Sequence, residues 1–270
     1  MSSSPQPKDE RSRRAAVRII RFCRPERLNA IDVTLAAELT AALREAEIDP
    51  SVRCVLLEAD GQHFMAGGNV KDFREKMALS KSERRIIFES ELHVLHPALY
   101  LMRRIGKPVL CAVNGAAAGA GFSLVTASDF VIASVDSFFV LSHISMGTSP
   151  DAGATYFLPR LVGARAALEF AILGERVMAE EAKRLGLITR ICARQSLREE
   201  SRKLAERLAR TPSIAFARTK SLIEHSLDRS LETQLQAEAE SFATCAATDD
   251  MEEGVAAFLQ KRDPAFGARR

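Results

Sequence analysis

Strand-like and helix-like segments alternate along the first half of the chain, and this order limits its fold most strongly. The first three segments are an apolar strand at 15–22, an amphipathic helix at about 33–47 and an apolar strand at 52–59. Asp32 stands directly before the helix, where its side chain can cap the first turn. Two strands separated by a helix are typical of a parallel sheet, because parallel strands need a crossover connection. The sequence therefore predicts an α/β fold.

The rest of the chain continues this pattern and then becomes helical. Further strands are predicted at 108–113, 130–134, 138–140 and 188–192, and a helix at 117–127. The predicted C-terminal helices lie at 180–185, 197–209, 231–245 and 249–260, and another has Thr211 as its cap and Pro212 in its first turn. We accordingly expect a disordered tail at 1–13, an α/β core at 14–200 and a helical region at 201–270.

The composition argues against several classes of protein. The 270 residues carry a formal charge of only +3, spread along the chain, which argues against nucleic-acid binding. No apolar run approaches the roughly 20 residues that span a bilayer, so we expect no membrane insertion. The five cysteines lie far apart without a CxxC pair, which predicts reduced thiols in the cytoplasm or, alternatively, in an organellar matrix. No group of residues has zinc spacing, so no metal site is predicted.

Two turns rich in small residues follow predicted strands. One is HFMAGGNVKDF at 63–73, and the other is VNGAAAGAGF at 113–122, which opens into a helix. Small residues let a backbone approach a ligand closely, and the free N–H groups at a helix start carry partial positive charge. The two turns together could supply two amide donors to a developing oxyanion. For each turn alone, the alternative is ordinary turn or packing chemistry, and neither turn matches a nucleotide-binding loop.

The segments FMAGGNVKDF and AVNGAAAGAGFSLVTASDFVIAS resemble the two signature loops of the crotonase (enoyl-CoA hydratase/isomerase) superfamily. The segments at 24–30, 158–163 and 179–188 resemble further parts of that family, so the resemblance runs from about 15 to 266. It implies a crotonase-like spiral of ββα units with a C-terminal α-helical extension. It also implies an enzyme that binds an acyl-CoA thioester and stabilises its enolate, with coenzyme A as part of the substrate and no permanently bound cofactor.

The same resemblance implies roles for individual residues. The oxyanion-hole amides fall on Gly68 and Ala120. The residues implied to bind coenzyme A are Arg24, Glu26, Leu28, Ala66, Asn69 and Val70. Phe258, Lys261 and Phe266 resemble the C-terminal segment that covers coenzyme A, often from a neighbouring subunit, which implies a homo-trimer or hexamer. The alternative for these three is a solvated lysine and core phenylalanines.

The chain departs from the hydratase pattern where hydratases of the family carry two glutamates. Ser123 and His143 stand at those positions, and they form at best a weaker acid–base pair than two carboxylates. Asp151 lies where related isomerases have their carboxylate, and we expect Pro150 and Asp151 to begin a helix. A single base can remove a proton at one carbon and return it at another, so Asp151 favours a double-bond isomerase. The alternative for Asp151 is an acid that only stabilises a helix start. His143 either assists the proton transfer or has a structural role. Ser123 is interpreted as helix packing or a pocket wall.

Other functions stay open at this point. One alternative is another reaction of the family, such as atypical hydration, hydrolysis or carbon–carbon cleavage. A second is a non-catalytic relative that binds acyl-CoA or RNA, although scarce tyrosine and absent tryptophan argue against RNA.

Overall fold

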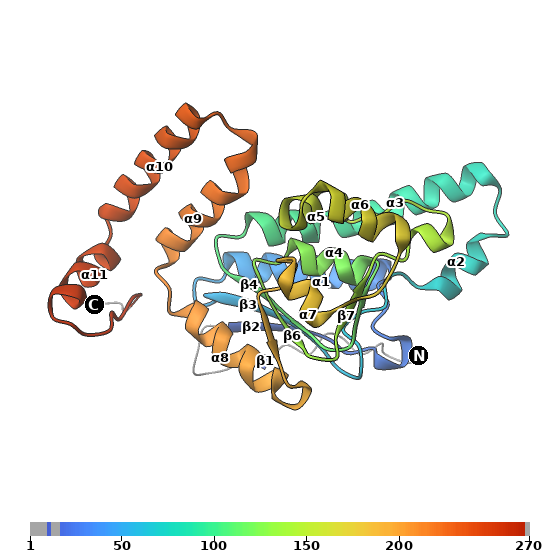
Figure 1. Cartoon of the computed structure of the whole chain (residues 1–270), viewed down its shortest axis with the longest axis horizontal. Coiled ribbons are helices and arrows are strands. Elements are labelled where there is room, and N and C mark those ends of the chain that lie inside the picture. Colours follow the sequence, from blue (N-terminus) through green and yellow to red (C-terminus); the bar gives the residue numbers. More distant parts are fainter. Residues whose placement is uncertain (1–9, 12–16, 268–270) are drawn as a thin grey trace.

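The computed structural model describes residues 10–11 and 17–267, and most of its strands form one twisted sheet (Figure 1). This six-stranded sheet has the order β1-β2-β3-β4-β6-β9. Its strands are β1 (Glu10–Arg11), β2 (Val17–Phe22), β3 (Cys54–Ala59), β4 (Val109–Val113), β6 (Phe130–Ser134) and β9 (Arg190–Cys192). Within this sheet, β2, β3, β4, β6 and β9 run parallel to one another, and β1 pairs antiparallel with β2 at the edge.

A second, three-stranded sheet lies beside the first. It consists of β5 (Ala116–Ala118), β7 (Phe138–Val140) and β8 (Val177–Met178) in the order β5-β7-β8. β5 and β7 are parallel, and β8 is antiparallel to β7. The chain thus passes from β4 to β5, and later from β6 to β7, so consecutive strands belong to different sheets. With a helix after β5, this succession gives the predicted spiral of ββα units.

Helices cover both faces of the large sheet and form the C-terminal part of the chain. The α-helices are α1 (Val33–Ile48), α2 (Val70–Lys76), α3 (Lys81–Arg104), α4 (Ala120–Ala127), α5 (Ala154–Val162), α6 (Ala164–Leu173), α7 (Ala179–Arg184), α8 (Leu197–Ala209), α9 (Ser213–His225), α10 (Leu231–Ala246) and α11 (Asp249–Leu259). Short 3₁₀ turns are η1 (Pro25–Arg27), η2 (Ile144–Met146), η3 (Arg194–Ser196) and η4 (Ser226–Asp228). Figure 1 shows α10 and α11 projecting away from the sheets, at the opposite end of the molecule from α2.

Alternate residues of each central strand face opposite sides of the large sheet. On β3, Val55 and Leu57 belong to the cluster that contains Leu39 of α1. Their neighbour Leu56 belongs to the cluster that contains Leu204 of α8. All three strand residues are fully buried, which explains why these strands read as continuous apolar runs. The helices on either side leave the ends of the strands free to carry functional loops.

The structure confirms the α/β fold, and several segments have the predicted bounds. The strands at 130–134 and 138–140 and the helix at 197–209 are observed as predicted, and Asp32 accepts a hydrogen bond from the Leu35 amide at 2.8 Å as an N-cap. The predicted disordered tail at 1–13 lies outside the described residues except for Glu10 and Arg11, which pair with β2.

Three local predictions are wrong. The segment at 117–127 begins as strand β5, because it pairs with β7, and its helix starts only at Ala120. The helix after Thr211 begins at Ser213, and the Thr211 hydroxyl donates to the Leu208 carbonyl at 2.7 Å instead of capping it. Pro150 and Asp151 lie in a loop, since α5 begins at Ala154. In addition, the short strand β8 was not predicted.

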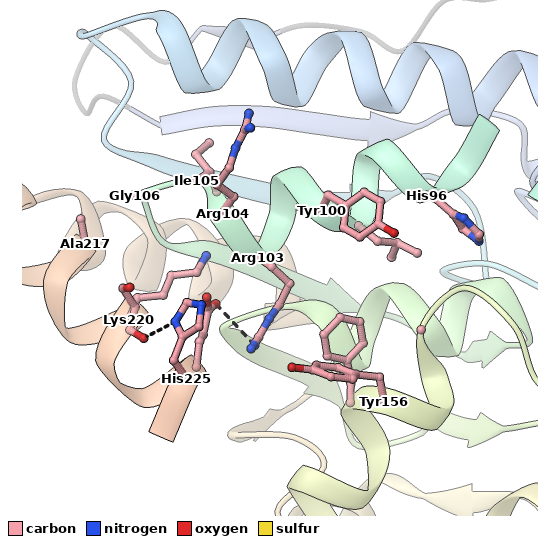
Figure 2. Close-up of a pocket in the computed structure, with 15 residues that line it drawn as sticks. His96, Tyr100, Arg103, Arg104, Ile105, Gly106, Tyr156, Ala217, Lys220 and His225 are labelled. Atoms are coloured by element: carbon pink, nitrogen blue, oxygen red, sulfur yellow. Dashed lines mark hydrogen bonds and ion pairs between the residues drawn. The ribbon is translucent and has the colours of Figure 1, made fainter. Parts of the chain in front are cut away.

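A buried ion pair fastens α9 to the core at a cavity of about 620 Å³ between α3, α5 and α9 (Figure 2). Lys220 points from α9 toward α3, where its ammonium donates to the Met102 carbonyl at 2.7 Å and to Asp129 at 2.9 Å. The same Asp129 oxygen accepts from the Val109 amide at 2.8 Å. Burial raises the pKa of Asp129, and the neighbouring Lys220 opposes that rise. The carboxylate therefore depends on Lys220 for compensation of its charge.

We predict that Lys220→Met lowers the free energy of unfolding by about 3 kcal/mol, because it leaves Asp129 buried without its cation. Urea denaturation would measure the change. Arg218→Met, at an exposed position of the same helix, is the control, and its effect should stay within about 0.5 kcal/mol. Equal effects of the two variants would contradict the prediction.

Candidate active site

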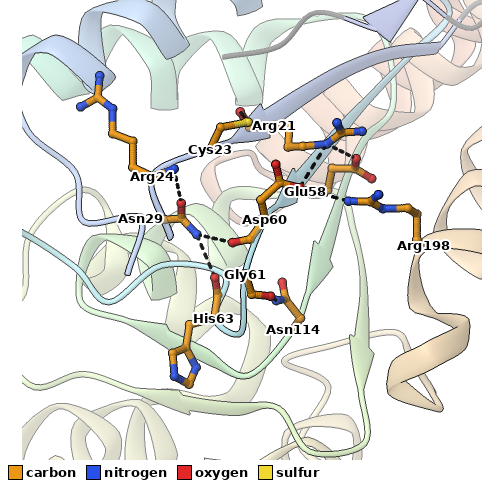
Figure 3. A network of polar contacts seen from close by, with 10 residues as sticks. All are labelled: Arg21, Cys23, Arg24, Asn29, Glu58, Asp60, Gly61, His63, Asn114 and Arg198. Carbon is orange, nitrogen blue, oxygen red and sulfur yellow. Dashed lines mark hydrogen bonds and ion pairs between the residues drawn. The ribbon is translucent and has the colours of Figure 1, made fainter. Parts of the chain in front are cut away.

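Three loops follow the ends of the neighbouring parallel strands β2, β3 and β4, and polar side chains hold these loops together (Figure 3). The Asn29 amide group donates to the carbonyls of Asp60 and His63 at 3.0 and 2.9 Å, and its oxygen accepts from the Arg24 amide at 2.8 Å. Asn114 donates to the Gly61 carbonyl at 2.9 Å. Loops at the carboxyl ends of parallel strands meet at one edge, which is the usual place for a site in such a sheet.

The turn after β3 then runs along β5. The Phe64 amide donates to the Asn114 carbonyl at 2.7 Å, and the Met65 amide to the Ala116 carbonyl at 3.1 Å. In return, the Ala118 amide donates to the Met65 carbonyl at 2.8 Å. These bonds form a short parallel pairing, which brings the two small-residue turns side by side.

The two turns touch at their glycines. A Cβ atom on Gly119 would lie 3.3 Å from the Gly67 Cα atom, and a Cβ on Gly67 would lie 3.3 Å from the Ala118 carbonyl oxygen. Both glycines have positive φ, 97° at Gly67 and 49° at Gly119. A larger residue at either position would be strained and would push the turns apart. The structure thus brings together the two segments that the sequence singled out.

Gly68 and Ala120 directly follow these touching glycines. Ala120 is the first residue of α4, so its amide has no partner within the helix. In the part of the chain that the structure describes, neither the Gly68 nor the Ala120 amide donates to another backbone or side-chain acceptor. Two uncommitted N–H groups therefore flank one close backbone contact, as an oxyanion hole requires.

His143 and Asp151 approach the same contact from the loops after β7 and before α5. The imidazole lies within 4.0 Å of the position that a Gly119 Cβ would take, and its Nε2 atom lies 3.4 Å from Oδ1 of Asp151. This contact between the imidazole and the carboxylate does not have the geometry of a hydrogen bond. Nδ1 of His143 and Oδ1 of Asp151 are buried, and among the described residues neither has a hydrogen-bond partner. A buried carboxylate oxygen that lacks a hydrogen-bond partner calls for an explanation, and this makes Asp151 a candidate to interact with a ligand.

Ser123 ties α4 to the loop that carries Asp151. Its hydroxyl is fully buried and lies 3.1 Å from the Asp151 carbonyl and 3.3 Å from the Gly119 carbonyl, both acceptors. The hydroxyl therefore has a structural partner on each side, in agreement with the interpretation of Ser123 as packing.

The residues predicted to bind coenzyme A lie partly at this edge. Arg24 carries its guanidinium inside the molecule, where it bonds to Asp32 at 3.0 Å and to Glu38 at 3.2 Å. That group is committed to α1, and only the backbone of Arg24 borders the site loops. The other predicted residues line the first two loops: Glu26, Leu28 and Val70 are exposed, Ala66 donates its amide to the Leu28 carbonyl, and Asn69 caps α2.

The C-terminal residues lie elsewhere. Lys261 and Phe266 follow α11, at the opposite end of the molecule from α2 (Figure 1), and Phe266 packs near Gly254. Phe258 on α11 is 84% exposed. One chain does not bring these residues to the glycine contact, so they can reach a site of this kind only on another copy.

The cavity between α3, α5 and α9 was not predicted from the sequence. Arg103 extends from α3 toward Glu224, with a nitrogen–oxygen distance of 3.4 Å, and it also lies over the Phe157 ring (Figure 2). Burial raises the pKa of Glu224, and Arg103 opposes that rise. Gly153, two residues after Asp151, lines the wall. The contributors come from three helices far apart in sequence, and no local motif marks them.

The described residues contain neither a metal-binding cluster nor a membrane-spanning helix. Within 10–11 and 17–267, no group of three or more histidine, cysteine, aspartate or glutamate residues is arranged to hold a metal ion. No helix in that part of the chain combines the length and the apolar character that crossing a bilayer would require.

Comparison with known proteins places this geometry in context. The enoyl-CoA hydratase/isomerase family model matches residues 12–269. The chain is 35% identical to 1,2-epoxyphenylacetyl-CoA isomerase of Escherichia coli K12, over 90% of this chain and 92% of that protein. It is 32% identical to 2,3-dehydroadipyl-CoA hydratase of the same organism, over 96% and 98%. Among solved structures, an enoyl-CoA hydratase from Polaromonas sp. JS666 superposes with a TM-score of 0.89 at 32% identity, over 96% of this chain and 98% of that one.

We predict that Gly121→Ala destabilises the site, because the new Cβ would lie 2.7 Å from both the Cβ and the carbonyl oxygen of Met65. The expected loss in the free energy of unfolding is about 1–3 kcal/mol, measured by urea denaturation. Gly254→Ala is the control, because its Cβ would make only an ordinary 3.6 Å contact with Phe266. Gly254 lies inside α11, where alanine is a better helix former than glycine, so this variant should be more stable by up to about 1 kcal/mol. Unchanged stability of Gly121→Ala would refute the close packing described here.

Proposed function

This chain belongs to the enoyl-CoA hydratase/isomerase (crotonase) family, and we propose that it is an isomerase that moves a double bond in an acyl-CoA thioester. The observation that carries the proposal is the buried Oδ1 atom of Asp151, which lies 3.4 Å from Nε2 of His143 and has no hydrogen-bond partner among the described residues. The resemblance to the family further implies that Ser123 and His143 stand where its hydratases carry two glutamates. A relative with 35% identity is named 1,2-epoxyphenylacetyl-CoA isomerase, which supports an isomerase that acts on an acyl-CoA thioester.

In the proposed reaction, the Gly68 and Ala120 amides donate hydrogen bonds to the thioester carbonyl oxygen. Negative charge develops on that oxygen when a proton leaves the neighbouring carbon. Donors that are already aimed at such an oxygen need no reorganisation, and each is worth roughly 3–4 kcal/mol in the transition state. The close contact of Gly67 and Gly119 holds the two donors in place.

Asp151 then acts as the single base. It takes a proton from the carbon next to the carbonyl of a 3-enoyl thioester, which gives a dienolate, and returns the proton at the γ carbon. The double bond moves to the 2-position, and no atom is gained or lost. His143 lies beside the carboxylate and is proposed to orient it between the two proton transfers.

Hydration is the second candidate, and it would need a water molecule held between two groups. Ser123 is poorly suited to that task, because it has one hydroxyl proton and that proton faces the Gly119 and Asp151 carbonyls, both acceptors. The His143–Asp151 pair remains as an alternative holder of water, and another relative is named as a hydratase. The two reactions differ in the product, since hydration adds the mass of one water.

We further propose that coenzyme A binds along the loops at 24–30 and 66–70 as part of the substrate, with no permanently bound cofactor. Lys261 and Phe266 would reach it from a neighbouring subunit of a homo-trimer or hexamer. The support is the apolar surface of the C-terminal arm, which we define as α9–α11. Its exposed apolar side chains include Ile223, Leu227, Leu231, Leu235, Phe242, Phe258 and Leu259. An apolar surface of this extent is typical of a protein interface.

We predict that Asp151→Asn lowers kcat for a 3-enoyl-CoA by about 10²–10⁴-fold, because the amide cannot accept the proton. The appearance of the conjugated 2-enoyl thioester, followed by ultraviolet absorbance, is the measurement. Glu175→Gln, at an exposed acid, is the control and should retain the wild-type rate. Activity of Asp151→Asn equal to the control, or a wild-type product heavier by one water, would reject the isomerase assignment.

We predict that Leu235→Ser combined with Phe242→Ser shifts the protein to a smaller species. Both side chains are more than half exposed in the single chain, so their replacement should weaken contacts between subunits without unfolding the protein. Light scattering after size-exclusion chromatography gives the mass. Gln236→Ser on the same helix is the control. A wild-type protein that is already monomeric would contradict the proposed oligomer.

A further inference from the structure

Lys76 is a buried cation at the end of the short helix α2, beside the candidate site. Its residue surface is only 8% exposed. The ammonium lies 2.5 Å from Asp72 on the same helix, and 2.5 and 2.6 Å from the two carboxylate oxygens of Glu91 on α3. It also sits over the Phe88 ring, 5.3 Å from the ring centre. One cation thus joins α2 to α3 through two carboxylates and an aromatic face.

Phe73 links this cluster to the turn that carries Gly68. Its ring packs edge-to-face with Phe88 at a centroid distance of 5.1 Å. On its other side, the Cζ atom of Phe73 lies 2.6 Å from the position that a Cβ on Gly68 would take. The ring tip therefore occupies the space of a side chain at Gly68 and limits how far that backbone can rotate.

The helix α2 has few other attachments. Of its seven residues, all of which the structure describes, only Lys76 is buried. Val70 is 60% exposed, and a helix of this length is not stable by itself in water. The position of Phe73 against Gly68 must therefore depend on the anchor at the far end of the helix. Neither Lys76 nor Glu91 belongs to the two signature turns, and nothing in the sequence pairs them.

We propose that Lys76 is a positioning residue for the oxyanion hole: its ion pairs with Glu91 and Asp72 hold α2 so that Phe73 fixes the orientation of the Gly68 amide. The structural half of this inference stands on the contacts alone, and the catalytic half rests on the proposed function. Because the Gly68 donor acts on charge that develops in the transition state, its misplacement should affect kcat more than KM.

The first test needs no substrate. Hydrogen exchange of the wild-type full-length protein would be compared with that of Lys76→Met and Lys71→Met, using peptides that cover 66–79. Lys71 is exposed on the same helix and serves as the matched control. We expect faster exchange in this segment for Lys76→Met only. Exchange equal to that of the control would overturn the inference, whatever reaction the protein catalyses.

The second test uses turnover of the 3-enoyl thioester. For Lys76→Met we expect kcat to fall by roughly tenfold with KM changed less than twofold, since displacing a donor by a fraction of an ångström costs part of its full effect. Lys76→Arg, which keeps the charge, should recover most of the rate. Glu91→Gln should act in the same direction with a smaller loss, and it replaces Lys76→Met if that variant does not fold.

The two proposals fail in different ways. Faster exchange together with an unchanged kcat would overturn the positioning role while the isomerase assignment stands. A wild-type protein that turns over no enoyl thioester would overturn the assignment and the catalytic half, and the exchange result would still decide whether Lys76 holds the turn. Loss of rate in Lys76→Arg equal to that in Lys76→Met would also reject the role of the charge.

Discussion

The close backbone contact between Gly67 and Gly119 is the constraint on which the rest of the site depends. It requires two glycines with positive φ and two strands that end at the same edge of one sheet. Hydrogen bonds from Met65 to Ala116, and from Ala118 back to Met65, keep the turns in register. Since the proposed donors at Gly68 and Ala120 are backbone amides, the proposed oxyanion hole would tolerate changes of side chain, and its chemistry would be set by the groups that surround it.

The surroundings here contain one carboxylate and one imidazole, both partly withdrawn from water. Oδ1 of Asp151 lacks a hydrogen-bond partner among the described residues, and such a buried acceptor is costly unless a ligand or water completes it. The Ser123 hydroxyl donates a hydrogen bond to the backbone carbonyl of Asp151 and so supports the loop that carries it. We therefore propose proton transfer by a single base, as in double-bond isomerisation. Hydration would instead need two groups that hold and activate one water molecule.

Two elements at opposite ends of the molecule, the C-terminal arm and α2, are largely exposed in the single chain. The C-terminal arm exposes large apolar side chains, and its last residues lie far from the glycine contact (Figure 1). At the opposite end of the molecule, α2 contacts α3 through its own residues Lys76 and Phe73, and Lys76 is its one buried residue. The two sheets therefore carry two outlying elements, α2 and the C-terminal arm, and the arm is proposed to contact a neighbouring copy.

The sequence by itself determined the α/β order, the two glycine turns and the cap at Asp32, because these depend on local periodicity and on residue types within a few positions. Asp151 was singled out by the resemblance to the family. The sequence did not determine that 116–118 is a strand or that Asp151 precedes its helix in a loop, since pairing with β7 and the packing of α5 decide both. Nor did it show that the Arg24 guanidinium is committed to Asp32 and Glu38. The partnership of Lys76 with Glu91 likewise exists only in the tertiary structure, because side chains that far apart meet through the turn between two helices and leave no periodic trace in the sequence.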